Sequence, residues 1–208
     1  KNPMFDSAQI ELFVARRHGE IVGTISALRD LKHEQHQNER AAFFGFFECV
    51  DQDVAQVRVA TAAEQSRSWG AEILRGPRNL SRSEEVGVVV EGFDRPSPML
   101  AAHNDTRYAT MLEDLGFTRH HDVLAYDISV YDEDGTPASY PEDLLDRANA
   151  VDIDGLELRP ARWSRIFADL RSGHEVFVEA FRDVPENTPM SLREFTSLGI
   201  GLLLNKFH

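Results

Sequence analysis

The sequence predicts an α/β fold in which helices flank a mixed, partly parallel sheet, followed by a C-terminal strand-helix-helix extension. Ala41–Val50 is apolar except at Glu48 and is too short and too aromatic for an amphipathic helix, so it predicts a strand buried on both faces. Val54–Trp69 has helical periodicity, and Gly70 is a suitable C-terminal cap. The apolar run Glu72–Arg75 follows. Strand, helix and strand in this order are typical of a right-handed crossover between parallel strands.

The segments before this unit predict an antiparallel hairpin. Ile10–Arg16 and Ile21–Leu28 alternate apolar and polar residues, and we place the turn between them at Gly19-Glu20. The polar stretch Asp30–Glu39 predicts a loop or a single helical turn. At the start of the central helix, Asp53 stands three residues before Gln56, which predicts that Asp53 is the N-cap.

A long irregular stretch, Arg78–Asn104, follows the crossover and is rich in Gly, Pro, Asn and Ser. Long loops in compact domains are usually functional, so this one is a candidate substrate surface. Within it, Val86–Val90 predicts a short strand. Asn104 or Asp105 is expected to cap a helix that runs to Leu115 and is closed by Gly116. Phe117–Arg119 and Val123–Val130 are then expected to supply one or two final strands.

The remaining chain suggests a boundary near the turn-rich segment Gly135–Pro141. We therefore expect one domain over residues 1–134, a linker over 135–154 with a short helix at Glu142–Ala150, and the extension over 155–208. The extension is predicted as a strand and two helices: Leu156–Pro160, Trp163–Phe181 and Ser191–Phe207. Its apolar faces need partners. It either begins a second domain of a longer tandem protein or completes the first domain, within one chain or by exchange in a homodimer.

Composition narrows the functional classes. The 208 residues carry a formal net charge of -13, which argues against binding to nucleic acid or to an anionic membrane. The single cysteine, Cys49, forms no intrachain disulfide, so we expect a reducing cytoplasm. His33 and His36 have a spacing found in metal sites, but no further ligands are clearly placed to complete a shell. No metal is expected.

Several short segments of the sequence, in this order, resemble segments of the GNAT acyltransferase superfamily: EIVGTISAL, FFGFFECV and EDLGFTRHHDVLAYDIS. More narrowly, FGFFE, RGPRNLS, EGFDRPSPM and LEDLGF are similar to an uncharacterised bacterial GNAT-like group. The likeness covers residues 10–130. It implies an N-acyltransferase that moves an acyl group from acetyl-CoA or another acyl-CoA, as co-substrate, to a small-molecule amine acceptor.

The resemblance also implies where the cofactor binds. In that family the pyrophosphate lies on backbone amides at the start of the central helix, and the pantetheine arm pairs with the edge where the central strand splays from its neighbour. The residues that correspond to this site are Val50, Gln52, Asp53, Val54 and Ala55, with Arg75, Asn79 and Ser81 beside them. The turn Asp51–Asp53 departs from the family because it is acidic and lacks glycine. This favours a second hypothesis, a degenerate, non-catalytic binding or assembly module.

Two residues are candidates for catalysis. Glu48 lies between apolar neighbours, which strengthens a carboxylate as a base; the alternative is a buried carboxylate paired with Arg75. The family's acid is a tyrosine four residues before the Gly of Leu-Gly-Phe, where this chain has Leu112. Tyr108, one helical turn earlier on the same face, is the candidate substitute. Asn79 and Ser81 either contact a ligand or cap a turn, and Cys49 is either a nucleophile or a core residue.

Overall fold

The structure is a computed structural model that describes residues 3–81, 84–98, 101–126, 128–139, 142–151, 155, 159–160, 162–184 and 187–204. The chain divides into two compact units. The first comprises Lys1–Arg119 together with Phe167–His208, and the second comprises His120–Ile166. The first unit contains the sheet and both predicted catalytic residues.

A four-stranded mixed sheet in the order β1-β2-β3-β4 forms the centre of the first unit. β1 (Ala8–Arg17) and β2 (Glu20–Asp30) pair antiparallel, which confirms the predicted hairpin. Its turn is at His18-Gly19, one residue earlier than expected. Both residues have positive φ, 52° and 90°, as a type I′ turn requires.

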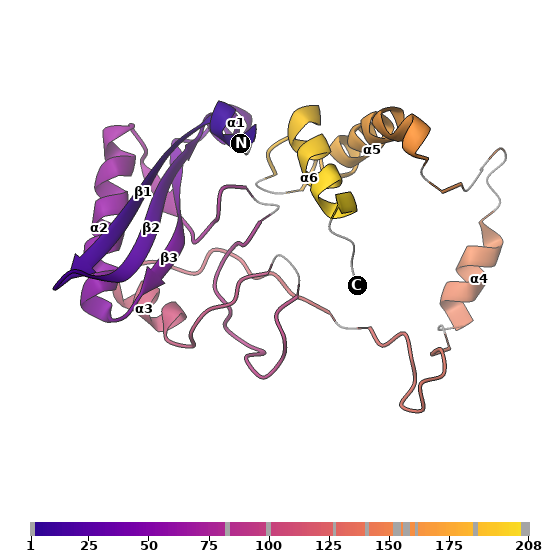
Figure 1. Ribbon diagram of the computed structural model, residues 1–208, viewed down its shortest axis with the longest axis horizontal. Coiled ribbons are helices and arrows are strands. Elements are labelled where there is room, and N and C mark those ends of the chain that lie inside the picture. Colours follow the sequence, from indigo (N-terminus) through magenta and orange to yellow (C-terminus); the bar gives the residue numbers. More distant parts are fainter. Residues whose placement is uncertain are drawn as a thin grey trace. The chain divides into compact units, whose positions relative to one another are not determined.

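The predicted crossover is confirmed. β3 (Ala41–Cys49) and β4 (Ile73–Arg75) run parallel, and α2 (Gln52–Ser68) connects them and covers one face of the sheet (Figure 1). The N-cap of α2 is Asp51, not Asp53. Asp51 is extended and its Oδ1 accepts a hydrogen bond of 2.9 Å from Val54 N. Because the helix begins at Gln52, Asp53 already lies within its first turn and cannot cap it.

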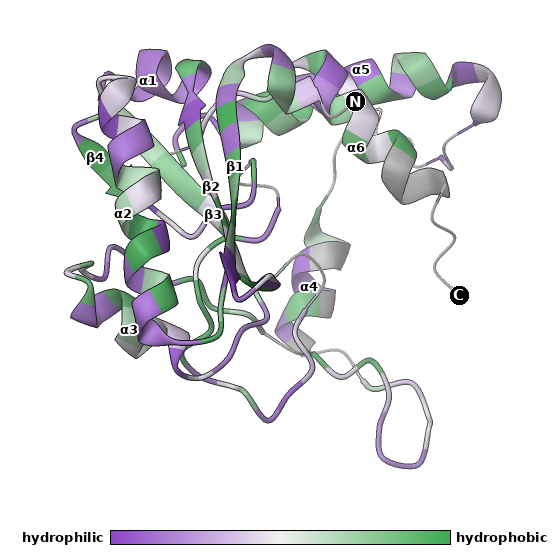
Figure 2. Cartoon of the chain, turned by 60° about the vertical axis from the view of Figure 1, so that its left-hand side comes forward, coloured by the Kyte–Doolittle hydropathy of each residue, from purple (hydrophilic) through white to green (hydrophobic). Residues whose placement is uncertain are grey.

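The hydrophobic core lies where α2 and α3 (Tyr108–Asp114) pack against the sheet. Phe44 and Ala55 are fully buried there, and Trp69 is partly buried against this core. Hydropathy colouring shows hydrophobic residues along β3 and β4, and both kinds of residue on α2 (Figure 2). This pattern agrees with a helix that has one face on the core and the other in solvent.

A bulge interrupts β3 in the middle. Ser26 pairs with Gly45 but Thr24 pairs with Glu48, so β3 has one more residue than β2 across this interval. Phe46, in the bulge, has a positive φ of 45°, and its N–H donates to Asn79 Oδ1 over 2.6 Å. A Cβ on Gly45 would lie 2.1 Å from Arg78 O. Beyond Phe43, therefore, the neighbour of β3 is the Arg78-Asn79 segment and not β4.

The two short helices of the first unit differ in how they are capped. α1 (Leu31–Gln37) forms where a loop or one turn was expected, and Asp30 caps it by accepting from the amides of residues 32 and 33. α3 confirms the predicted helix, but neither Asn104 nor Asp105 caps its first turn, because it begins only at Tyr108 and Arg107 holds the cap position without a side-chain bond. Asn104 Oδ1 instead accepts from Val89 N.

Two strand predictions were wrong. Val86–Val90 makes a single bridge, between Val86 and Arg78, because Gly87 turns the backbone away with a φ of 80°. Among the described residues of Phe117–Arg119 and Val123–Val130 there is no strand. The second segment has the two-residue period of a strand, yet without a pairing partner for its backbone groups the period is insufficient. Its apolar side chains, for example Tyr126 at 81%, are exposed.

The second unit contains α4 (Glu142–Ala150), as predicted, and the 3₁₀ turn η2 (Trp163–Arg165). The predicted strand Leu156–Pro160 lies mostly outside the described residues, so it stays a prediction. The expected C-terminal helices are present as α5 (Ile166–Ala180) and α6 (Leu192–Leu204). No helix in the described ranges is both long and apolar enough to cross a bilayer.

Hydrogen bonds connect the C-terminal part of the first unit to α1 and to the 3₁₀ turn η1 (Pro3–Asp6). Lys32 Nζ contacts Glu194 Oε2 at 2.6 Å, Gln37 donates to Asn187 O, and Arg193 pairs with Asp6. An open groove of about 570 Å³ lies beside this pair, lined by Pro3, Leu192, Arg193, Thr196, Ser197 and Ile200. The domain boundaries proposed from the sequence remain a prediction.

Candidate functional site

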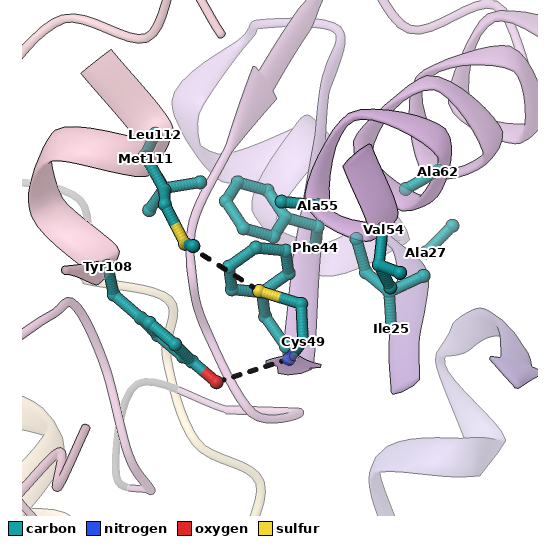
Figure 3. Close-up of a cluster of buried hydrophobic side chains, with 11 residues drawn as sticks. Ile25, Ala27, Phe44, Cys49, Val54, Ala55, Ala62, Tyr108, Met111 and Leu112 are labelled. Carbon is teal, nitrogen blue, oxygen red and sulfur yellow. Dashed lines mark hydrogen bonds between the residues drawn. The ribbon is translucent and has the colours of Figure 1, made fainter. Parts of the chain in front are cut away.

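The two predicted catalytic residues, Glu48 and Tyr108, contact one another at the C-terminal end of β3. The Tyr108 hydroxyl donates to Glu48 Oε2 over 2.6 Å. The Tyr108 hydroxyl oxygen itself accepts a 3.2 Å bond from Cys49 N, and the close-up shows this bond and the Tyr108 side chain reaching from α3 to the end of β3 (Figure 3). The ring packs edge-to-face on Phe47, 5.4 Å between centroids. The Tyr108 side chain is therefore fixed by the hydrogen bonds of its hydroxyl group and by the packing of its ring.

The two groups differ in their surroundings. Tyr108 is 5% exposed; burial, and then the hydrogen bond to Glu48, raise the pKa of its hydroxyl well above the ordinary value. Glu48 is exposed, so the alternative of a buried carboxylate was wrong. Its pairing with Arg75 is also absent, because Arg75 pairs with Glu39. Since Glu48 is open to solvent, a substrate can reach it.

The bulge in β3 explains why Glu48 is exposed between two buried residues. Phe47 and Cys49 belong to the core on the α2 face, so Glu48 points to the opposite face. The extra residue places Glu48 on the same face as Gly45, three positions earlier, where a regular strand would put them on opposite faces. The sequence signal for this is Gly45 within an aromatic run, which is typical of a bulge.

The start of α2 does not fit a pyrophosphate. Val54 N is bonded to the Asp51 side chain, and Ala55 N donates to Asp51 O over 3.0 Å, so neither predicted amide is available. Arg17 Nη1 lies 2.7 Å from Asp51 Oδ2, and this contact and the cap hold the pKa of the Asp51 carboxyl below its ordinary value. The carboxylate thus occupies the place that the family gives to phosphate.

The side chains around this turn make contacts within the protein. Gln52 Nε2 donates to Met111 O over 3.2 Å, which joins α2 to α3. Asp53 lies in the first turn of the helix, and Val50 is exposed beside it. The residues implied for cofactor binding at Val50 and Gln52–Ala55 are therefore close together, but the structure gives two of the amides to Asp51.

The other predicted cofactor residues belong to the splay between β3 and β4. Asn79 accepts from Phe46 N and donates to Glu85 Oε2 over 2.9 Å, so it holds the bulge as well as the turn. Ser81 N donates to Asn79 O at 2.7 Å, in the turn that the sequence suggested. On the β3 edge that the family leaves open for pantetheine, Asn79 and Tyr108 occupy the amides of Phe46 and Cys49.

Cys49 is best described as a core residue. It is 8% exposed, its Sγ lies 3.9 Å from Met111 Sδ, and burial raises the pKa of its thiol (Figure 3). The other residues considered for metal are apart from this site: His33 is buried and lies 3.0 Å from Glu39 Oε1. Within the described ranges, no cluster of three or more His, Cys, Asp or Glu is arranged to hold a metal ion.

Sequence reasoning missed three residues on the strands next to Glu48. Thr24 on β2 pairs with Glu48, and Val14 on β1 pairs with Thr24, so Val14, Thr24 and Glu48 form one row across the sheet. Arg17, near the end of β1, neutralises the cap of α2. Only the register, which depends on the bulge, brings these residues together.

Comparisons with known proteins find relatives that are longer than this chain. No family model and no solved structure matches it. Protein YghO of Escherichia coli is 28% identical over 200 residues, 96% of this chain and 50% of that protein. A bacterial ceramide synthase of Caulobacter vibrioides is 32% identical over 203 residues, 97% of this chain and 51% of that protein. The chain thus spans about half the length of the curated relatives it matches, and it is similar to that half along nearly its whole length.

Proposed function

We propose that this chain takes part in acyl transfer to the nitrogen of an amine, with Glu48 as the general base and Tyr108 as the residue that positions it. The observation that carries the proposal is the 2.6 Å hydrogen bond from Tyr108 to an exposed carboxylate at the end of the central strand. The GNAT-like order of strands and helices supports it. So does the similarity to a ceramide synthase, since ceramide is an amide formed by acylation of a long-chain amino alcohol.

The chemistry required of Glu48 is proton removal. An aliphatic amine is mostly protonated at neutral pH and must lose a proton before its lone pair can attack an acyl carbon. Tyr108 binds one carboxylate oxygen, Oε2. Glu48 Oε1 has no hydrogen-bond partner among the residues that the structure describes, so it can accept this proton. The N–C bond then forms, the bond from the acyl carbon to its leaving group breaks, and the second proton that the nitrogen loses passes through water to the leaving group.

Tyr108 suits a positioning role better than the acid role expected from the family. Its raised pKa makes it a weaker acid than an ordinary thiol, so proton transfer from Tyr108 to a departing thiolate is uphill. By donating to Glu48, it fixes one carboxylate oxygen and leaves the other directed to the substrate. The bond from Cys49 N in turn fixes the tyrosine oxygen.

The test is amide formation by the chain itself, measured by mass spectrometry with a set of acyl thioesters and primary amines. Glu48→Gln keeps size and polarity but removes the base, and we expect a fall of about 10²- to 10⁴-fold in kcat. Glu11→Gln, which alters an exposed carboxylate of β1, is the matched control and should retain activity. Wild-type protein that forms no amide with any pair, or a fully active Glu48→Gln variant, would refute the proposal.

A second candidate is the non-catalytic binding module, which the closed start of α2 favours. With Asp51 capping the helix and paired to Arg17, a pyrophosphate at this turn would meet a carboxylate in place of amides. On this alternative neither acetyl-CoA nor a longer acyl-CoA raises the unfolding temperature, and no amide is formed. A rise in unfolding temperature with acyl-CoA would exclude this form of the alternative and would place the diphosphate away from the turn.

A further inference from the structure

The sheet has two faces, and they are covered differently. α2 covers one face, where Phe13, Ile25 and Phe44 enter the core (Figure 1). Near the start of β3 the other face is also buried, as Leu28 and Phe43 show. Toward the end of β3 this second face is open. Leu12 is 63% exposed and Val14 is 55% exposed.

The register places these apolar residues beside the candidate base. Val14, Thr24 and Glu48 are directly opposite one another on successive strands, so their side chains project from the same face. Leu12 projects from that face as well, two residues before Val14 on β1. With strands about 4.8 Å apart, Val14 lies about 10 Å from Glu48 across the sheet. Phe46, 38% exposed, stands at the bulge just before Glu48.

Thr24, which lies between Val14 and Glu48, is compatible with an apolar ligand. The Thr24 hydroxyl donates to Phe46 O over 2.7 Å, so it needs no partner from a bound molecule. The row thus runs from the Glu48 carboxylate through a satisfied threonine to Val14, and Leu12 lies two residues from Val14 along β1. Single exposed Leu or Val side chains are common on protein surfaces, but here they form a continuous path that ends at a carboxylate.

We propose that Leu12, Val14 and Thr24, here called the apolar strip, bind the hydrocarbon chain of the acceptor, a long-chain primary amine whose nitrogen lies at Glu48. The inference rests on the proposed function, because it assigns the acceptor of the same site. Charge complementarity selects an amine for the carboxylate end. A short polar amine would use Glu48 but leave the strip uncovered.

The first test is the dependence of acyl transfer on chain length, with ethanolamine, hexylamine, octylamine, dodecylamine and sphinganine as acceptors. Each methylene that the strip buries should lower KM about four-fold, until the chain extends past Leu12. Leu12→Ser and Val14→Ser should each raise KM for dodecylamine about ten-fold without changing kcat/KM for ethanolamine. Val57→Ser, which alters an equally exposed residue on α2, is the control and should change neither.

A second measurement does not depend on turnover. A long-chain amine that carries a terminal photoreactive diazirine should label the β1 peptide, Ala8–Arg17, and Leu12→Ser should reduce the labelling. Labelling without amide formation would support the strip and refute the proposed function. Amide formation with equal KM for all chain lengths would support the function and refute the strip. Labelling confined to α5 or α6, or a dimer that Leu12→Ser converts to a monomer, would also overturn the inference.

Discussion

Replacement of Asp30 by alanine should be among the most destabilising single changes in the first unit. Asp30 Oδ1 accepts from the amides of Lys32 and His33 and so caps α1, while Oδ2 accepts a 2.8 Å bond from Arg78 Nη2. Asp30 is 1% exposed and Arg78 is 7% exposed. The Arg78 guanidinium also lies 4.0 Å from the centre of the Phe43 ring. The pair thus connects β2, α1 and the segment that follows β4.

The magnitude follows from two losses. Loss of the cap costs about 1 kcal/mol. Removal of one partner from a buried ion pair costs about 3–5 kcal/mol. Since a domain is stable by only about 5–15 kcal/mol, Asp30→Ala should leave much of the unit unfolded or close to it. Asp30→Asn retains an oxygen for the cap and should cost less, about 2 kcal/mol.

Urea unfolding followed by circular dichroism measures these differences. The double variant Asp30→Ala/Arg78→Met should recover most of the loss, because no charge is then left buried, and the double-mutant cycle should show a coupling of at least about 2 kcal/mol. Asp105→Ala, which breaks an exposed pair with Arg107, is the control and should leave the midpoint unchanged. A loss below about 1 kcal/mol for Asp30→Ala, or additive effects in the cycle, would refute this reasoning.

Three further predictions concern single residues, each measured by urea or thermal unfolding. Arg58→Met should be neutral or stabilising by about 1 kcal/mol, because Nε and Nη2 of the buried guanidinium have no hydrogen-bond partner among the described residues; a clear loss would show that the charge is compensated. Gly45→Ala should strongly destabilise the first unit, since its Cβ would lie 2.1 Å from Arg78 O. A stable variant would mean that the Arg78-Asn79 segment can move away from β3. For Glu194, burial raises the pKa of the carboxyl, but the bonds from Lys32 and Ser191 outweigh it and lower that pKa overall. Its contribution is therefore present above about pH 4.3 and lost as pH falls through the folded pKa, so wild type and Glu194→Gln should differ at pH 7 and converge in acid.

Local patterns were sufficient to predict the elements whose partners are close in sequence. The alternation on either side of Gly19 predicts the hairpin, and the apolar run before a helical period predicts the crossover. Each of these patterns lies entirely within the one or two helices or strands that it predicts. The run Val123–Val130 has the same period as β1, yet its described residues form no strand, because a strand also depends on a partner that its own residues do not specify.

The candidate site was predictable in its residue types but not in its geometry. Glu48 and Tyr108 were chosen for their chemistry, and the structure brings them within 2.6 Å. That Glu48 is exposed, and that it shares a row with Val14, follows from a single bulge at Phe46. One added residue reverses the face of everything after it, and neither the aromatic run nor Gly45 indicates at which peptide this happens.

The side chains that occupy the β3 edge also bear on self-association. A strand edge with unpaired amides is a template on which another chain can add and begin to aggregate. Beyond Phe43, the amides of Phe46 and Cys49 are bonded to Asn79 and Tyr108, and the positive φ of Phe46 breaks the flat ladder that an incoming strand would need. The most aromatic strand of the protein is thereby protected from edge-to-edge pairing by two polar side chains, one of which also positions the candidate base.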